Sequence, residues 1–199
     1  MKKIIHAIFA IIALLGTLSG SFSVIACSEN LDEILIQLNN AILNYDFAKV
    51  KVLSEKACKM DNDFGCYMYA GLLAKEYDYQ NALKFLEKSC KLNHKGACAE
   101  SGIYYYQGVG GTKTDTLKAI EYYKKGCDVD DKNLNLDNDY KYNVAVGCYI
   151  VGSHYTDQDN KELANKYFSK SCLLGVRSAC KITIMYHMLQ NLPDSTKNK

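Results

Sequence analysis

The chain has 199 residues, of which 48% are hydrophobic, and its formal net charge is +2. This composition predicts a single domain with a continuous core and excludes disorder over most of the length. Lys2 and Lys3 account for the whole net charge, so the rest of the chain has no basic surplus with which to bind nucleic acid.

Residues 1–26 are predicted to be a secretory signal peptide. Two lysines precede an apolar run from Ile4 to Leu18, and Val24-Ile25-Ala26 then leads to Cys27. Two readings of Cys27 remain open. The stretch resembles a relaxed bacterial lipobox, whose cysteine is lipidated, and ordinary cleavage near Ala26 would instead leave Cys27 free or paired between molecules. We expect an exported protein, periplasmic or secreted, whose membrane contact is limited to a possible lipid anchor at Cys27.

The predicted helices begin at Leu31. Apolar residues recur at helical spacing from Leu31 to Leu43, and residues 44–46 form a turn with Asp46 as the N-cap of the next helix. That helix runs from about Phe47 to Met60 and ends near Cys58. These two helices form a first repeat without an opening cysteine.

The remaining cysteines reveal the period of the repeat. Distances of 32 residues separate Cys58 from Cys90, Cys66 from Cys98, and Cys148 from Cys180. A fixed period of this size indicates a solenoid of helix pairs. Later repeats run from Cys66 to Cys90, Cys98 to Cys127 and Cys148 to Cys172, and a capping helix extends from Lys181 to Leu192. The predicted solenoid therefore covers residues 27–192, and 193–199 form a polar tail.

Local disulfides follow from this arrangement. Each closing cysteine ends one helix and each opening cysteine begins the next, so a reversing turn can bring the two Cα atoms within disulfide range. Export favours oxidised cysteines over thiols or metal ligands. We predict the pairs Cys58–Cys66, Cys90–Cys98, Cys127–Cys148 and Cys172–Cys180.

Positions counted from the cysteines predict the packing. Four positions after each opening cysteine, the repeats have a small residue: Ala70, Gly102 and Gly152. The predicted capping helix has the bulky Ile184 at this position instead. Residues five before the closing cysteine are expected in the core: Leu53, Phe85, Tyr122 and Tyr167. Lysines two before it are expected to complement the helix dipole: Lys56, Lys88, Lys125 and Lys170.

The segments Ala97-Cys98, Gly102 to Gly110 and Lys118 to Cys127 carry a family resemblance. They resemble a Sel1-like repeat with the added cysteine pair of the Helicobacter cysteine-rich protein family. The resemblance implies an all-α fold, a right-handed superhelix of αα-hairpins related to tetratricopeptide arrays, and export. Members of that family are described as penicillin-binding proteins or β-lactamases, and others as host-interacting antigens.

The sequence holds no complete hydrolase site. Ser178-Ala179-Cys180-Lys181 matches Ser-x-x-Lys, but no Ser-Asp-Asn is present and Lys113-Thr114 is followed by Asp115 rather than glycine. The histidines of the mature chain lie far apart in the sequence, at positions 94, 154 and 187. We therefore expect no metal and no cofactor, and leave catalytic residues unassigned.

Two functions remain as hypotheses. The favoured one is a monomeric scaffold whose first helices form a concave surface for a protein, peptide or peptidoglycan-derived ligand. Tyr105 and Tyr155 share a repeat position and are expected to pack. Tyr104 and His154, one residue earlier, are expected to line the groove with Tyr106. The alternative, β-lactam binding or hydrolysis, rests on the family resemblance.

Overall fold

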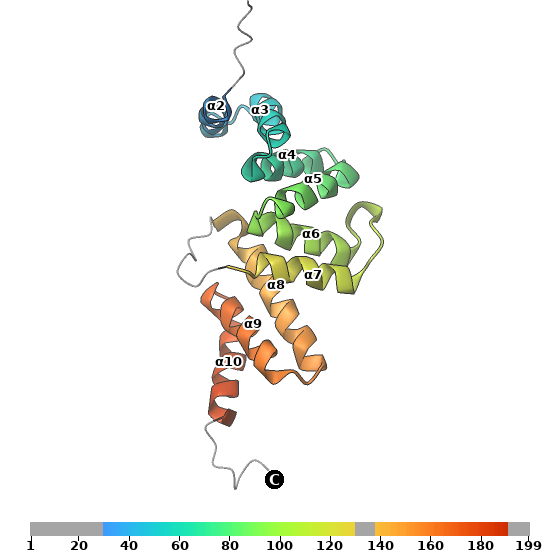
Figure 1. Ribbon diagram of the computed structural model, residues 1–199, viewed down its shortest axis with the longest axis vertical. Coiled ribbons are helices and arrows are strands. Elements are labelled where there is room, and N and C mark those ends of the chain that lie inside the picture. Colours follow the sequence, from blue (N-terminus) through green and yellow to red (C-terminus); the bar gives the residue numbers. More distant parts are fainter. Residues whose placement is uncertain (1–29, 130–137, 191–199) are drawn as a thin grey trace, which may run out of the picture. The chain divides into compact units, whose positions relative to one another are not determined.

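In the computed structural model, residues 30–129 and 138–190 are described, and they are helical throughout apart from short connections (Figure 1). The predicted signal peptide, Cys27 and the predicted tail lie outside the described residues. Consecutive helices pack against each other, and α6 also packs on α8. The helices are α2 Leu31–Leu43, α3 Phe47–Lys59, α4 Asp63–Lys75, α5 Tyr79–Lys91, α6 Lys95–Gln107, the short 3-10 helix η1 Val109–Gly111, α7 Thr116–Gly126, α8 Asn138–Asp157, α9 Lys161–Leu173 and α10 Arg177–Gln190.

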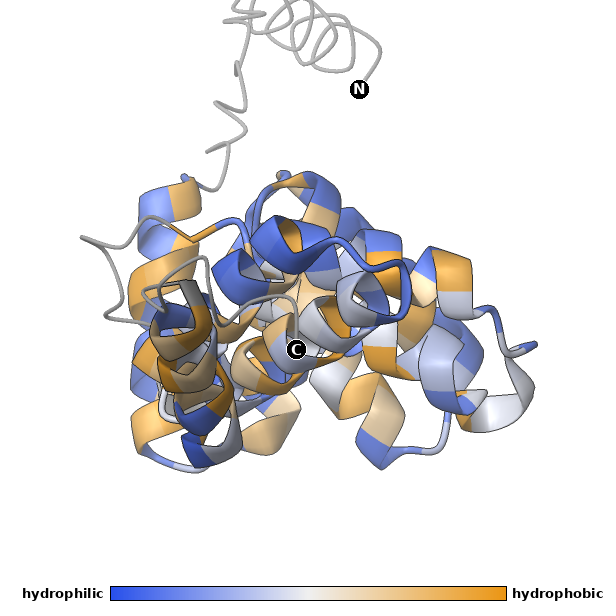
Figure 2. Cartoon of the chain, turned by 90° about the horizontal axis from the view of Figure 1, so that it is seen from below, coloured by the Kyte–Doolittle hydropathy of each residue, from blue (hydrophilic) through white to orange (hydrophobic). Residues whose placement is uncertain are grey.

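The prediction of an αα-hairpin solenoid is confirmed. The four hairpins are α2–α3, α4–α5, α6–α7 and α8–α9, and α10 follows as an unpaired helix. Hydrophobic and hydrophilic residues alternate along the helices (Figure 2), as expected where each helix buries one side and exposes the other. Ile184, which the sequence placed in a cap, is exposed on α10.

Short turns reverse the chain between helices in the same way. Asp46, predicted as an N-cap, accepts a hydrogen bond from the backbone N–H of Lys49. Further N-caps of this kind are Asn62, Asp78, His94, Asp115 and Asn160. Before most of these caps stands a residue with positive φ, as at Tyr45 and Asp61. Tight three-residue turns therefore set the hairpin spacing.

All four predicted disulfides are present. Their Cα atoms lie 4.4 to 5.5 Å apart, within the range that the sequence argument assumed. The opening cysteine lies inside the first helix of a repeat rather than at its first residue, because α4 begins at Asp63 and α6 at Lys95. The difference is largest in α8, which begins at Asn138, ten residues before Cys148.

The early start of α8 adds packing that the cysteine spacing did not predict. Val144 is fully buried, and a Cβ at Gly96 would approach the Tyr140 ring to 2.5 Å. Gly96 therefore lets α8 lie directly against the N-terminal turn of α6. These contacts stabilise the extra helical turns that precede Cys148.

Small residues set the approach of the paired helices, as predicted. A Cβ at Gly102 or at Gly147 would come within 2.6 Å of the Tyr123 ring, and one at Gly152 would meet the Phe168 ring at 2.9 Å. The core position, however, was predicted one residue too early. Of the residues five before the closing cysteine, Leu53 is buried but Phe85, Tyr122 and Tyr167 are half-buried. The residues one later are all buried: Ser54, Leu86, Tyr123 and Phe168.

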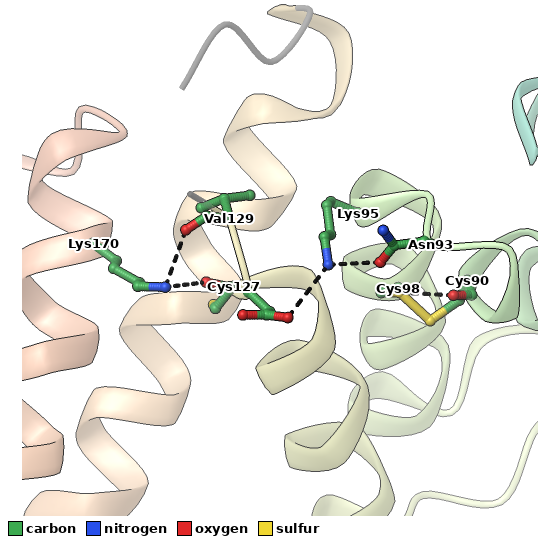
Figure 3. Close-up of polar contacts among 8 residues, drawn as sticks. Cys90, Asn93, Lys95, Cys98, Cys127, Val129 and Lys170 are labelled. Carbon is green, nitrogen blue, oxygen red and sulfur yellow. Dashed lines mark hydrogen bonds and ion pairs between the residues drawn. A yellow bond between two sulfur atoms is a disulfide. The ribbon is translucent and has the colours of Figure 1, made fainter. Parts of the chain in front are cut away.

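The lysine column stabilises the junctions between repeats. Lys88 donates to the carbonyl of Cys58 at 2.7 Å. Lys170 donates to the carbonyls of Cys127 at 2.9 Å and Val129 at 3.2 Å (Figure 3). Both lysines thus bond carbonyls at or just beyond the C-terminal end of a helix other than their own, whereas the sequence argument had paired each lysine with the dipole of its own helix. That helix belongs to the preceding repeat, so these bonds tie one hairpin to the next.

Candidate functional site

A mostly apolar pocket of about 320 Å³ opens beside the first helix of the second hairpin, α4. Side chains from α2, the α2–α3 turn and α3 form one wall, α4 forms the floor, and α6 contributes a single acid. Its lining residues are Ile42, Tyr45, Phe47, Val50, Tyr67, Met68, Gly71, Leu72, Lys75 and Glu100. Three hairpins therefore contribute to one pocket.

The packing of the helices does not require a glycine at position 71, in the floor of the pocket. Gly71 lies in the middle of α4, where glycine costs about 0.5–1 kcal/mol relative to alanine, and a Cβ there would meet nothing within 4 Å. The same repeat position, five after the opening cysteine, holds larger residues elsewhere: Ile103, Ser153 and Met185. The missing side chain leaves open space in the pocket.

Glu100 is the second departure from the repeat. It stands two residues after its opening cysteine, where the other hairpins and α10 have aliphatic or thioether side chains: Met68, Ile150 and Ile182. Burial raises the pKa of the Glu100 carboxyl, and a hydrogen bond with Tyr67 acts in the opposite direction. Burial, followed by the nearby Glu100 charge, raises the pKa of Tyr104 to about 12. The acid is thus held among apolar and phenolic groups.

An aromatic cluster positions Tyr67. Its ring stacks on His94 with centroids 4.4 Å apart and 20° between the planes, and Tyr140 meets it edge-on at 6.0 Å. His94 is buried, and its Nδ1 accepts the backbone N–H of Ala97 at the start of α6. His94 therefore has a structural role as a helix cap. The cluster holds the Tyr67 ring, whose hydroxyl shares a hydrogen bond with Glu100, in place.

The opposite end of the pocket carries a cation. The Lys75 ammonium lies 5.2 Å from the centroid of the Phe47 ring, and both residues are exposed. Tyr67 and Lys75 are eight residues apart on α4, which is about 12 Å along a helix axis. The pocket is therefore polar at both ends, acidic at Glu100 and basic at Lys75, and apolar between them.

The residues predicted to line a groove do not line this pocket. Tyr104 is only 4% exposed, so its placement in an open groove is corrected: the side chain belongs to the core around α5 and α6. Tyr106 is 44% exposed and approaches Tyr123. His154 is half-buried and shares a hydrogen bond with Gln158.

Tyr105 and Tyr155, by contrast, pack as predicted. Tyr105 stacks on Tyr122 with centroids 5.6 Å apart, and its hydroxyl donates to Glu87 at 2.7 Å. Tyr155 stacks in the same way on Tyr167. Lys118 completes the third hairpin's network by donating to the Tyr105 hydroxyl at 2.7 Å. Because Glu87 comes from the preceding hairpin, this polar network joins two repeats.

The hydrolase motif has no enclosed setting. Ser178 and Lys181 are both exposed on the first turns of α10. Within residues 30–129 and 138–190, no group of three or more histidine, cysteine or acidic residues is placed to hold a metal ion. The same part of the chain contains no helix with the length and apolarity needed to cross a membrane.

These features define a class of protein, an αα-hairpin repeat scaffold with a disulfide at each hairpin junction. The model of the Sel1 repeat matches residues 65–94, 96–131 and 139–176, and the chain belongs to the Sel1 repeat family. No curated protein matches it. Several solved structures are similar, two of which are described here. Helicobacter pylori cysteine rich protein B is 29% identical over 73% of this chain and 94% of its own, with a TM-score of 0.46. A Sel1 repeat protein from Oxalobacter formigenes is 19% identical over 76% of this chain and 60% of its own, with a TM-score of 0.55, and shares the fold.

Proposed function

We propose that this protein is an exported scaffold that binds a segment of a protein or peptide in the pocket beside α4. The observation that carries the proposal is the pocket itself, where three hairpins meet around a mid-helix glycine with open space above it. Solenoids of helix pairs commonly use the surface of their first helices for binding. The four disulfides support an oxidising compartment outside the cytoplasm.

The lining favours a peptide over a glycan. Tyrosine and phenylalanine at the mouth lead to aliphatic and thioether groups below, which suit a buried apolar side chain of a partner. A cell-wall sugar would need a dense array of hydrogen-bonding groups, and the middle of this pocket has few. Nothing in the geometry around Ser178 favours β-lactam hydrolysis, so no second function is proposed.

Filling the pocket at Gly71 tests the proposal. The oxidised mature protein would select binders from a displayed library of random peptides of about twelve residues. Gly71→Leu should abolish the selected binding, because its side chain enters the open space. Gly71→Ala is the matched control: it removes the same glycine, should raise stability by about 0.5–1 kcal/mol and should retain most of the binding.

Circular dichroism and thermal melts would show that both variants fold. Equal binding by Gly71→Leu and the wild type would refute a site at this pocket. A library that yields no Gly71-dependent binder would count against peptide binding altogether.

A further inference from the structure

We propose that Glu100 selects ligands in which a positively charged group stands next to an apolar side chain. The ligand class is a peptide segment with leucine, methionine or phenylalanine followed or preceded by lysine or arginine. This inference rests on the proposed function, since it names the chemistry of the segment that the pocket beside α4 would take.

The first support is the position of the acid. Glu100 and Met68 occupy the same position in two successive repeats, two residues after the opening cysteine, and both line the pocket. Apolar side chains at this position suffice for the fold in three of the four cases. A carboxylate in partly buried surroundings is less stable than such a side chain unless a partner compensates it.

The second support is the incomplete pairing of the carboxylate. An ionised carboxylate has about four acceptor sites on its two oxygens, and the hydrogen bond from Tyr67 occupies one. Across the described residues, no ion pair joins Glu100 to a lysine, arginine or histidine. A ligand ammonium or guanidinium would supply the missing charge-assisted bonds.

The third support is the polarity of the pocket. Glu100 shares a hydrogen bond with Tyr67 on α4, its charge acts on Tyr104 on its own helix, and His94 stacks on Tyr67. Lys75 stands at the other end of the floor, about two helical turns away. A bound segment would therefore place its cation at the α6 end, with its apolar side chain over Gly71.

Synthetic peptides provide a direct test. The probes are peptides of about twelve glycine and serine residues that carry leucine or phenylalanine at the centre, with lysine, glutamine or glutamate as the neighbouring residue. Binding to the immobilised, oxidised protein is measured at low salt. Lysine peptides should bind the wild type on the order of tenfold more tightly than glutamine peptides, and glutamate peptides should bind most weakly.

Glu100→Gln should reduce the lysine-to-glutamine ratio of affinities to about one. Glu121→Gln, which removes an equal charge from an exposed position on α7, should keep the ratio. A wild type that binds all apolar probes equally would overturn the selectivity and leave the proposed function in place. If no probe binds the wild type, and Gly71→Leu also leaves the binding of library-selected peptides unchanged, both the selectivity and the proposed function are overturned.

Discussion

Gly102 and Gly71 are both glycines in the middle of a first helix, yet they do opposite things. A glycine is needed at position 102 because the Tyr123 ring occupies the space beside it, and an added Cβ would lie 2.6 Å from that ring. Gly71 has nothing within 4 Å of the same virtual atom. The first glycine serves the packing of the hairpin, and the second leaves a hollow. Function is therefore best sought where a repeat departs from its own pattern without a structural reason.

Glu100 fits this comparison. Gly102 and Gly152 share one register and one role, each lying against an aromatic ring of the partner helix. Glu100 shares its register with Ile150 and Ile182 but not their chemistry. Both departures, Gly71 and Glu100, line the same pocket. The repeat alignment alone does not show that Gly71 and Glu100 lie close together in the folded protein.

Alanine at the two glycines would separate their roles most strongly. Gly102→Ala should destabilise the protein by about 1–3 kcal/mol, because the new methyl group forces the Tyr123 ring or the helix backbone to shift. Gly71→Ala should stabilise it by about 0.5–1 kcal/mol, since only the helix propensity changes. Denaturant unfolding of the disulfide-intact variants measures both. Effects of the same sign would show that the distinction between packing and pocket glycines is wrong.

Replacing the acid would sharpen the comparison further. Burial raises the pKa of Glu100, so the folded protein holds this proton more tightly than the unfolded chain. The stability from this group is complete below the ordinary pKa of 4.5 and is lost as the pH rises through the folded-state pKa. Glu100→Met should therefore gain about 1 kcal/mol over the wild type at neutral pH, with a smaller gain at pH 4.

Urea titrations of both proteins across this range would measure the difference. The other titrating groups are common to the two proteins, so their contributions to the pH dependence of stability largely cancel. A wild type that is more stable than Glu100→Met at neutral pH would indicate that the carboxylate stabilises the fold rather than serving a ligand.

The sequence was sufficient for most of the fold. Helix Leu31–Leu43, the Asp46 cap and three disulfides follow from local spacing, because a separation of eight residues recurs at three of the four junctions. The fourth disulfide, Cys127–Cys148, has a separation of 21 and followed from the order of closing and opening cysteines. The wrong predictions concern which side of a helix a residue occupies. Successive residues on a helix point about 100° apart, so placing the core at Tyr122 instead of Tyr123, or Tyr104 in a groove, needs only one residue of misregister.

The candidate site was only partly within reach of the sequence. Aligning the repeats on their opening cysteines displays Glu100 against methionine and isoleucine, and Gly71 against isoleucine, serine and methionine. The expectation of tyrosine ligands overlooked this signal. The pocket wall from the α2–α3 turn could not be predicted this way. The Glu87 network could not be predicted either, because its acid and its tyrosines come from different hairpins.

Methionine methyl NMR gives the most direct test of the pocket. Met68 lines it, whereas Met60, Met185 and Met188 are exposed outside it and serve as internal controls. The protein would be labelled at its methionine methyl groups and titrated with a leucine–lysine peptide, and Met68→Leu would assign the pocket signal. We predict that the Met68 resonance shifts while the other three stay in place. Shifts of Met185 or Met188 with an unchanged Met68 signal would contradict it.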